Sequence, residues 1–299
     1  MRRRPTGATL HGINWARQRK LSGKKGEIMT RIEELAYWIN ERYKMKLRKE
    51  NPGDNLWAYG WSNDPYMGTV RYCNVHREDD AVTRWLAEHW RPQHHEVWEI
   101  VLARMVNYTP TLEYINQDIL DLETIKKNLK DRRAAGEKVF TSAYTISTCG
   151  KSMDKIDYVI DWVVQAVQER GELWEEPITL EKCHRQLTYI DGLGSFLAAQ
   201  VVADLKNTAG HPLQTAPDWW TWCAPGPGSL KGLQAFYGAK IAARTFANDI
   251  KEAWMCMEGL IDRRVPRIGM QDFQNCLCEF SKYVRVKEGG HVRNRYPAR

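Results

Sequence analysis

Residues 189–205, "YIDGLGSFLAAQVVADL", place Gly192 and Gly194 one residue apart, directly before a helix-like run of small and apolar residues. Gly192 can adopt the positive φ that a tight turn requires. Gly194 leaves backbone N–H groups bare at a helix N-terminus, where a phosphate can bind, and Ser195 joins the two glycines as a candidate contact to the DNA backbone. The pattern predicts a helix-hairpin-helix DNA-binding motif over residues 179–206; an ordinary αα-hairpin with a glycine turn is the alternative.

Helical periodicity continues through most of the 299 residues, and strand signals are limited to short candidates near 67–72 and 138–147. We therefore expect an all-α or nearly all-α protein with a helix-hairpin-helix, DNA-glycosylase-like helical fold. The other expected helices cover residues 28–50, 77–90, 97–108, 111–135, 152–171, 229–262 and 270–284.

The net charge of +7 is concentrated at the N-terminus, because residues 1–26 hold five Arg and three Lys and no acid. Residues 1–27 are expected to be a basic, flexible tail that attracts polyanions such as nucleic acid, or simply a solvated terminus. Residues 28–299 would form the helical DNA-modifying domain. A candidate division into two lobes lies near 171–179, where Pro177 stops one helix and Thr179 can cap the next.

Seven cysteines are scattered along the chain, and this odd number argues against a disulfide framework. No run approaches the ~20 apolar residues that span a bilayer, and the N-terminus lacks a secretory signal. These features indicate an intracellular protein in a reducing compartment. Cys276 and Cys278 fall inside an expected helix without a second pair at zinc-finger spacing, so no structural metal site is expected.

Asp218 follows the second hairpin glycine by 24 residues, close to where helix-hairpin-helix DNA glycosylases carry a catalytic aspartate. Phe196 stands where the lyase-type enzymes of that class carry a Schiff-base lysine, which disfavours a lysine-dependent lyase. Trp219 and Trp222 come directly after Asp218; they either fill the core or form a stacking wall for an extruded base. A helix cap or turn residue is the alternative for Asp218.

Six ordered blocks within residues 70–296 resemble the α-glutamyl/putrescinyl thymine pyrophosphorylases of hypermodified-DNA bacteriophages, also described as amino acid:DNA transferases. The helical domain of this family is shared with 5-hydroxymethyluracil DNA kinases. The blocks are "REDDAVTRWL" (77–86), "VLARMVNY" (101–108), "VFTSAYTI" (139–146), "IDGLGSFLAAQVVADL" (190–205), "APGPGSLKG" (224–232) and "LCEFSKYVR" (277–285).

The resemblance implies a reaction on DNA in which hydroxymethyluracil has already been pyrophosphorylated on its 5-hydroxymethyl oxygen. An amine such as glycine, glutamate or putrescine would replace the pyrophosphate and yield hypermodified thymine. The sequence contains no G-x-x-x-x-G-K-[ST] motif, so the chain is expected to act after a separate kinase step. A phage-encoded enzyme of this kind would work in the cytoplasm of the bacterial host.

The resemblance and the chemistry together nominate residues for each role. A leaving pyrophosphate needs cations and amide donors, for which the candidates are Arg77, Arg104, Lys231, Lys282, Gly226 and Gly228. A flipped base needs aromatic walls and polar groups that read its edge, for which the candidates are Tyr144, Trp219, Trp222, Tyr283, Asn107 and Gln200. The attacking amine needs a carboxylate base, and the candidates are Asp218, Asp204 and Glu279.

Structural roles compete with these assignments. Arg104 and Glu279 could form a buried ion pair that holds helices together, and Lys282 with Tyr283 could belong to a helix face packed on the core. No cofactor is certain; a divalent cation such as Mg²⁺ could accompany the pyrophosphate, bound by Asp79, Asp80 or Asp204. Two further functions remain open for the whole chain: a monofunctional DNA glycosylase, and a non-catalytic module that binds modified DNA.

Overall fold

The computed structural model describes residues 25–53, 60–90, 96–116, 121–141, 146–171, 179–292 and 295. These residues form helices and turns without any strand, and an isolated antiparallel bridge joins Val70 to Arg295. The expectation of an all-α protein is confirmed. The two short strand candidates form no strand in this part of the chain, although residues 142–145 lie outside the described residues.

The chain divides into two compact units, which we call the terminal unit (Met1–Val75 with Pro225–Arg299) and the central unit (His76–Ala224). The two boundaries therefore lie at 75/76 and 224/225. The candidate division near 171–179 falls within the central unit, and residues 172–178 of that segment lie outside the described residues.

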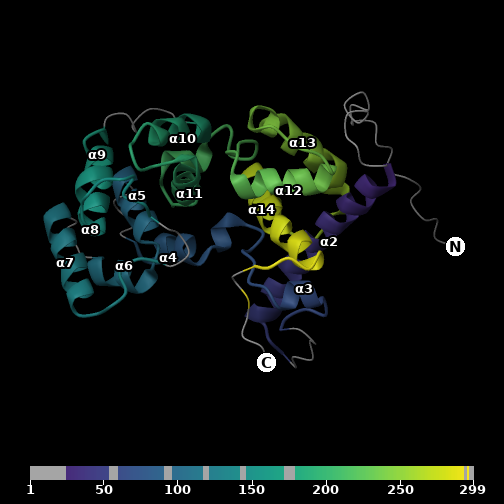
Figure 1. Cartoon of the computed structure of the whole chain (residues 1–299), viewed down its shortest axis with the longest axis horizontal. Helices are drawn as coiled ribbons and strands as arrows, with labels where there is room; N and C mark the ends of the chain where they lie inside the picture. Colours follow the sequence, from purple (N-terminus) through teal and green to yellow (C-terminus); the bar gives the residue numbers. More distant parts are fainter. Residues whose placement is uncertain are drawn as a thin grey trace. The chain divides into compact units, whose positions relative to one another are not determined.

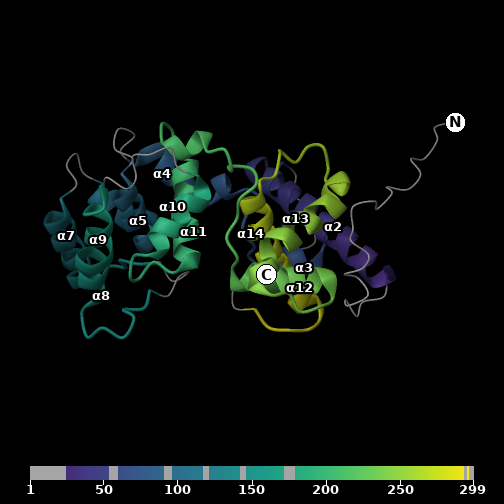
Figure 2. The ribbon, with the colours of Figure 1, turned by 90° about the horizontal axis from the view of Figure 1, so that it is seen from above.

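The central unit is built around helix α5 (Val97–Val106), every residue of which is buried. Helices α10 (Leu180–Thr188) and α11 (Ser195–Lys206) lie side by side (Figures 1 and 2), and α11 packs on α5. The remaining elements of this unit are η1 (Arg77–Asp79), α4 (Ala81–His89), α6 (Thr109–Ile115), α7 (Leu122–Ala134), α8 (Lys155–Asp157), η2 (Tyr158–Val164), α9 (Gln165–Gln168) and η4 (Pro212–Thr215).

Segment η2 is π-helical and continues α8 into α9 without a break. A π-helical turn is rare and often marks a functional position. Here its buried face carries Tyr158 and Val163, which belong to the apolar core of the central unit. That face supports the hairpin described below.

The terminal unit is built from two stretches of sequence, one from each end of the chain. Helix α2 (Lys25–Glu50) packs on α12 (Pro227–Tyr237) and α14 (Met270–Lys287), and α12 packs closely along α14 (Figure 1). The close approach depends on Gly232, where a Cβ would overlap the backbone of Leu277. The unit also contains α3 (Pro65–Gly68), η5 (Ala243–Thr245), α13 (Phe246–Met257) and η6 (Glu258–Leu260).

Most helix expectations agree with these elements, and two need correction. The single helices expected over 111–135 and 229–262 are each interrupted, giving α6 and α7 in the first case and α12 and α13 in the second. In the second case Gly238 ends α12 with a φ of 64°, in the left-handed region that glycine favours. The basic tail remains a prediction, because residues 1–24 lie outside the described residues. Within the described residues, no helix combines the length and apolar character that a membrane crossing requires.

Candidate functional site

The hairpin between α10 and α11 has the expected geometry. Thr179 caps α10, its hydroxyl accepting a hydrogen bond from the Lys182 N–H at 3.0 Å. Gly192 has a φ of 100°, and a Cβ there would lie 2.5 Å from the Tyr158 hydroxyl and 2.7 Å from Val163 Cγ2. Both the backbone conformation and the packing on η2 therefore require glycine at this corner.

The other glycine lies on the open side of the hairpin. Gly194 is the N-cap of α11 with φ −65° and ψ 163°, and a Cβ there would meet nothing within 4 Å. Gly194 and Ser195 are exposed. The N–H groups of a first helical turn have no intrahelical acceptor and carry the positive end of the helix dipole. This end of α11 can therefore receive an anion without steric hindrance, while the Gly192 side of the corner is closed by protein.

Exposed aromatic side chains lie on and beside the hairpin, and no sequence motif indicated them as a group. Tyr189 and Phe196, which flank the two glycines, are 69% and 47% exposed, and Trp162 is 42% exposed. The Trp162 indole N–H donates to Asp191 at 3.0 Å, and Lys151 Nζ lies 3.7 Å from the Trp162 ring centroid. The sequence signal that could have revealed these three aromatic residues is a large aromatic side chain on the polar face of an amphipathic helix.

Five of the predicted residues come together inside the central unit, in a polar cluster that is largely buried. Arg104 is completely buried and its Nε donates to Asp204 Oδ2 at 2.6 Å, while its Nη1 donates to Asn107 at 2.9 Å. Thr83 donates to Asp204 Oδ1 at 2.7 Å and accepts from Arg104 Nη2 at 3.0 Å. The remaining pair is Arg77, whose Nη2 donates to Gln200 at 2.7 Å.

A buried ion pair with Glu279 was the alternative considered for Arg104; the partner that the structure shows for Arg104 is Asp204 of its own unit. Asp204 is 1% exposed and its carboxylate is occupied by Arg104 and Thr83. Arg104 and Thr83 thus occupy the Asp204 carboxylate, and a cation could reach Asp204 only by displacing Arg104. Breaking such a buried pair typically costs about 3–5 kcal/mol.

Asp80 lies at the edge of this cluster, where it caps α4 and sits 3.3 Å from Arg104 Nη1. Burial acts to raise the pKa of Asp80, but the charges of Arg104 and Arg77 more than offset that effect, so its pKa lies below the usual value. The carboxylate therefore stays ionised and contacts the Arg104 guanidinium, with the charge of Arg77 nearby.

A cavity of about 610 Å³ opens beside this cluster, and Thr83 belongs to both. The rings of Trp219 and Trp220 lie 4.3 Å apart in its wall. Lys206, only 2% exposed, holds its Nζ 3.9 Å from the Trp219 ring centroid, and Arg84 supplies a second cation. Arg84 also pairs with Asp79 at 3.2 Å, and Glu78 contributes a carboxylate to the lining. The cavity thus combines aromatic faces with two cations and one carboxylate, and the cations suit an aromatic ring that bears anionic groups.

Of the two tryptophans predicted to stack on a base, Trp219 lines this cavity. Trp222 instead packs against the core of the central unit, with its ring 5.2 Å from that of His184. Sequence reasoning missed Lys206 and Arg84. The signal for Lys206 was present, since it directly follows a buried apolar run on α11 at a position where a lysine is unusual.

Asp218 has the structural role that was considered as its alternative. Its Oδ1 accepts from the Leu180 N–H at 2.8 Å and its Oδ2 from the Glu181 N–H at 3.0 Å, so it satisfies two N–H groups at the start of α10. Asp218 is nevertheless half-buried, whereas Asp204 and Glu279 are buried. Of the three candidate bases it is the most accessible to solvent.

The predicted residues at the C-terminal end of the chain lie in the terminal unit, on α14. Glu279 is 2% exposed; it accepts from the Cys73 N–H at 3.1 Å and from Lys282 Nζ at 2.6 Å. Burial acts to lower the pKa of Lys282, but the Glu279 carboxylate outweighs it and the pKa is raised. The Tyr283 hydroxyl donates to Asp64 Oδ2 at 3.0 Å.

The Gly-Pro-Gly segment begins α12 and packs this helix on α14. Gly226 is the N-cap, and its N–H donates to Ser229 Oγ at 3.1 Å. A Cβ at Gly228 would overlap Cys278 Sγ, so this glycine is required by helix packing. Lys231 is exposed on α12, and Tyr144 lies outside the described residues. The proposed amide clamp of this segment therefore has a competing structural explanation.

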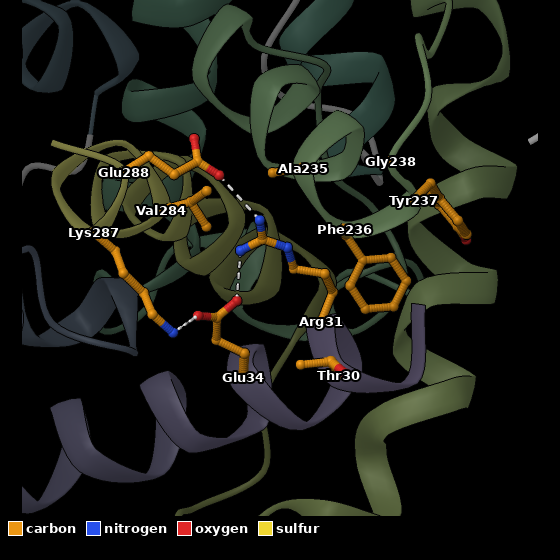
Figure 3. Close-up of a pocket in the computed structure, with 10 residues that line it drawn as sticks. All are labelled: Thr30, Arg31, Glu34, Ala235, Phe236, Tyr237, Gly238, Val284, Lys287 and Glu288. Carbon is orange, nitrogen blue, oxygen red and sulfur yellow. Dashed lines mark hydrogen bonds and ion pairs between the residues drawn. The ribbon is translucent and has the colours of Figure 1, made fainter. Parts of the chain in front are cut away.

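A second cavity, of about 750 Å³, lies between α2, α12 and α14 (Figure 3). Its charged side chains pair with one another: Arg31 donates to Glu34 at 2.6 Å and to Glu288 at 3.0 Å, and Lys287 donates to Glu34. Because each charge already has a partner of opposite sign, this cavity offers no unmatched group to a ligand. In the part of the chain that the structure describes, no three His, Cys, Asp or Glu side chains are grouped so as to hold a metal ion.

Comparisons with known proteins agree with this architecture. Residues 30–292 match the family described as 5-hmdU DNA kinase, helical domain. Over 226 residues the chain is 26% identical to the 5-hmdU DNA kinase of Bacillus phage SP10, a match that covers 66% of this chain and 35% of that protein. The chain thus spans about a third of the length of this curated relative. No solved structure matches the chain. Because the family match covers most of the sequence, the chain belongs to the family of 5-hmdU DNA kinase helical domains.

Proposed function

We propose that the protein is a DNA base-modifying transferase, which replaces the pyrophosphate of 5-(pyrophosphoryloxymethyl)uracil in DNA with an amine. The family relation supports an enzyme that modifies hydroxymethyluracil-containing DNA. The observation that carries the finer proposal is the cavity of the central unit, where Trp219 and Trp220 adjoin Lys206 and Arg84. A pyrimidine ring that bears a pyrophosphate needs this combination of aromatic surface and positive charge.

The reaction breaks one C–O bond and forms one C–N bond. The pyrophosphate leaves with the electron pair of the bond between its bridging oxygen and the 5-methylene carbon, and the uracil ring supplies electron density to that carbon. The neutral amine then donates its lone pair to the methylene, and the new nitrogen loses a proton to a base. Cations near the departing oxygens lower the barrier, because negative charge develops there in the transition state.

The residues would divide this work as follows. Trp219 and Trp220 would stack on the flipped base, and Lys206 and Arg84 would face the pyrophosphate, with Arg77, Arg104, Asn107, Gln200 and Asp204 holding the wall beside them. Asp218 remains our candidate for the base, and a divalent cation such as Mg²⁺ would assist the departing pyrophosphate. The 299 residues contain no P-loop motif, so a separate kinase would phosphorylate the base before the transfer.

The hairpin would hold the DNA backbone at the exposed N-terminus of α11. Gly194→Glu tests this contact, because the backbone at Gly194 accepts any residue and a side chain there meets open space. We expect the variant to keep its melting temperature and to bind DNA about tenfold or more weakly. The reason is that the new carboxylate would repel the phosphate that the N-terminus of α11 is proposed to bind. Unchanged DNA affinity would show that the hairpin does not contact the backbone.

Incubation of the protein with pyrophosphorylated hydroxymethyluracil DNA and candidate amines distinguishes the three functions. The DNA is then digested to nucleosides and measured by mass spectrometry, with and without a chelator. A new aminomethyl nucleoside supports the transferase. Abasic sites with released base would instead identify a glycosylase, and unchanged DNA with tight binding would identify a non-catalytic binding module.

A further inference from the structure

The cavity of the central unit is lined by two carboxamides in addition to its tryptophans and charged groups, those of Asn207 and Gln214. Asn207 is the C-cap of α11, and Gln214 belongs to the short helix η4, which packs on α11. A carboxamide carries both a donor and an acceptor, so it can distinguish one base from another only if its orientation is fixed. In both residues a hydrogen bond to the backbone fixes that orientation.

Each carboxamide uses one of its two polar atoms within the protein. Asn207 Nδ2 donates to the Ala203 carbonyl at 2.8 Å, and Gln214 Oε1 accepts from the Gly210 N–H at 3.0 Å. A carbonyl only accepts and an N–H only donates, so neither amide can turn by 180° without losing its bond. Among the described residues, Asn207 Oδ1 and Gln214 Nε2 have no hydrogen-bond partner. One acceptor and one donor are therefore left for a ligand.

The segment that carries these amides is held in place by further hydrogen bonds. Thr208 Oγ1 donates to the Asp204 carbonyl at 2.8 Å, and the Trp219 indole N–H donates to the Lys206 carbonyl at 3.4 Å. Gly210 has a φ of 82°, in the left-handed region that glycine favours, within the turn between α11 and η4. The amides and the Trp219 ring are thus ordered before a ligand arrives, which reduces the entropy lost on binding.

The two carboxamides that the sequence nominated for reading a base are engaged elsewhere. Asn107 Oδ1 accepts from Arg104, and Gln200 Oε1 accepts from Arg77. Both therefore belong to the polar cluster beside the cavity, and neither is among the residues that line it. Charged donors form stronger hydrogen bonds than neutral ones, so an uncharged base would not displace these arginines.

We propose that Asn207 and Gln214 determine which base the cavity accepts: Asn207 Oδ1 accepts a hydrogen bond from N3–H of a uracil ring, and Gln214 Nε2 donates to a neighbouring ring carbonyl. The inference rests on the proposed function, to which it adds the residues that set base specificity. Uracil has a donor at N3 between two carbonyl acceptors, whereas N3 of cytosine is itself an acceptor. Cytosine in the same position would place the N3 lone pair against the Asn207 oxygen, leaving both acceptors without a donor.

Binding of the full chain to single-stranded oligonucleotides tests these contacts without turnover and without the cost of opening a base pair. Three otherwise identical strands carry 5-hydroxymethyluracil, 5-hydroxymethylcytosine or an abasic site at the centre, and fluorescence anisotropy gives the Kd of each. We expect the wild type to bind the hydroxymethyluracil strand about tenfold or more tightly than either of the others, which is the usual scale for a base that is recognised through two hydrogen bonds.

Two variants test the contacts separately, each at a temperature where its melting curve shows it to be folded. Asn207→Ala removes the acceptor and should reduce the preference for hydroxymethyluracil over hydroxymethylcytosine by about threefold or more. Gln214→Met keeps the length of an exposed side chain but removes the donor, and should reduce the preference over the abasic strand by a similar factor. Gln165→Met, the same change at an exposed position of α9 outside the cavity, should leave both preferences unchanged.

The binding and transfer assays fail in distinguishable ways. If the wild type does not distinguish the three strands, or if either variant keeps the preference that it should lose, the assignment of Asn207 and Gln214 is overturned. The transferase function still stands in that case if the aminomethyl nucleoside forms. If the preferences depend on both residues while no such nucleoside forms, the assignment stands and the transferase function is wrong.

Discussion

The two glycines of the hairpin are expected to respond very differently to substitution, because Gly192 has no room for a side chain and Gly194 does. In Gly192→Ala, the methyl group would lie 2.5 Å from the Tyr158 hydroxyl and 2.7 Å from Val163 Cγ2, on a backbone with φ 100°. The strained backbone costs about 1–2 kcal/mol, and overpacking of a well-packed core adds about 1–3 kcal/mol. Together these terms predict a loss of about 2–5 kcal/mol in the free energy of unfolding.

Gly194→Ala is the matched control, since the same methyl group meets nothing within 4 Å on a backbone with φ −65°. We expect its stability to change by less than about 0.5 kcal/mol. For a unit of this size, each kcal/mol lowers the melting temperature by about 2–4 °C. Thermal unfolding followed by circular dichroism should therefore place Gly192→Ala about 4–20 °C below wild type, with Gly194→Ala close to wild type.

Removal of the Tyr158 hydroxyl provides an internal check. Tyr158→Phe in the Gly192→Ala background eliminates the shorter of the two overlaps and should restore part of the lost stability. Equal melting temperatures for the two glycine variants would refute the reasoning, because they would show that the corner is not packed on η2.

Three further predictions concern the candidate site. In Asp218→Asn the side chain can accept only one of the two N–H hydrogen bonds at the start of α10, so we expect the free energy of unfolding to fall by about 1 kcal/mol. If Asp218 is also the base, the variant should have no turnover at temperatures where it is fully folded. Full activity there would limit Asp218 to its capping role. The pKa of Asp80 is lower in the folded than in the unfolded state, so its contribution to stability is fully present above the unfolded value of about 3.9 and declines as the pH falls further; the stability difference between wild type and Asp80→Asn should therefore shrink below about pH 4, and a difference that stays constant between pH 7 and pH 3 would contradict the assignment. Gly228→Ala should destabilise the terminal unit because its methyl group overlaps Cys278 Sγ, and the double variant with Cys278→Ala should regain stability. Chemical denaturation measures both variants, and a double variant no more stable than Gly228→Ala would contradict this packing.

The local parts of this architecture could be predicted from the sequence because their signals are local. The spacing of Gly192 and Gly194 and the capping residue Thr179 define α10, the corner and α11 within one short segment. The positive φ expected of Gly192 is confirmed. The residues grouped from the family blocks in the central unit also prove to be neighbours, since Arg77 contacts Gln200 and Arg104 contacts Asp204.

Features that depend on long-range packing could not be predicted in this way. Asp204 was not considered as a partner for Arg104 in the sequence, and it becomes one because α11 packs on α5. The role of Gly228 depends on how closely α12 approaches α14. The terminal unit is discontinuous because α2 packs on helices more than 170 residues away in the sequence, a pairing for which periodicity gives no indication.

The central claim is that the 5-methylene carbon of the base loses oxygen and gains nitrogen, and an oxygen label tests it directly. DNA would be prepared with ¹⁸O at the oxygen that bridges this carbon to the pyrophosphate, and then treated with the protein and an amine. Our account predicts that the label leaves with the pyrophosphate while an aminomethyl nucleoside appears. Label that stays in hydroxymethyluracil, with phosphate released by cleavage of the P–O bond, would contradict it.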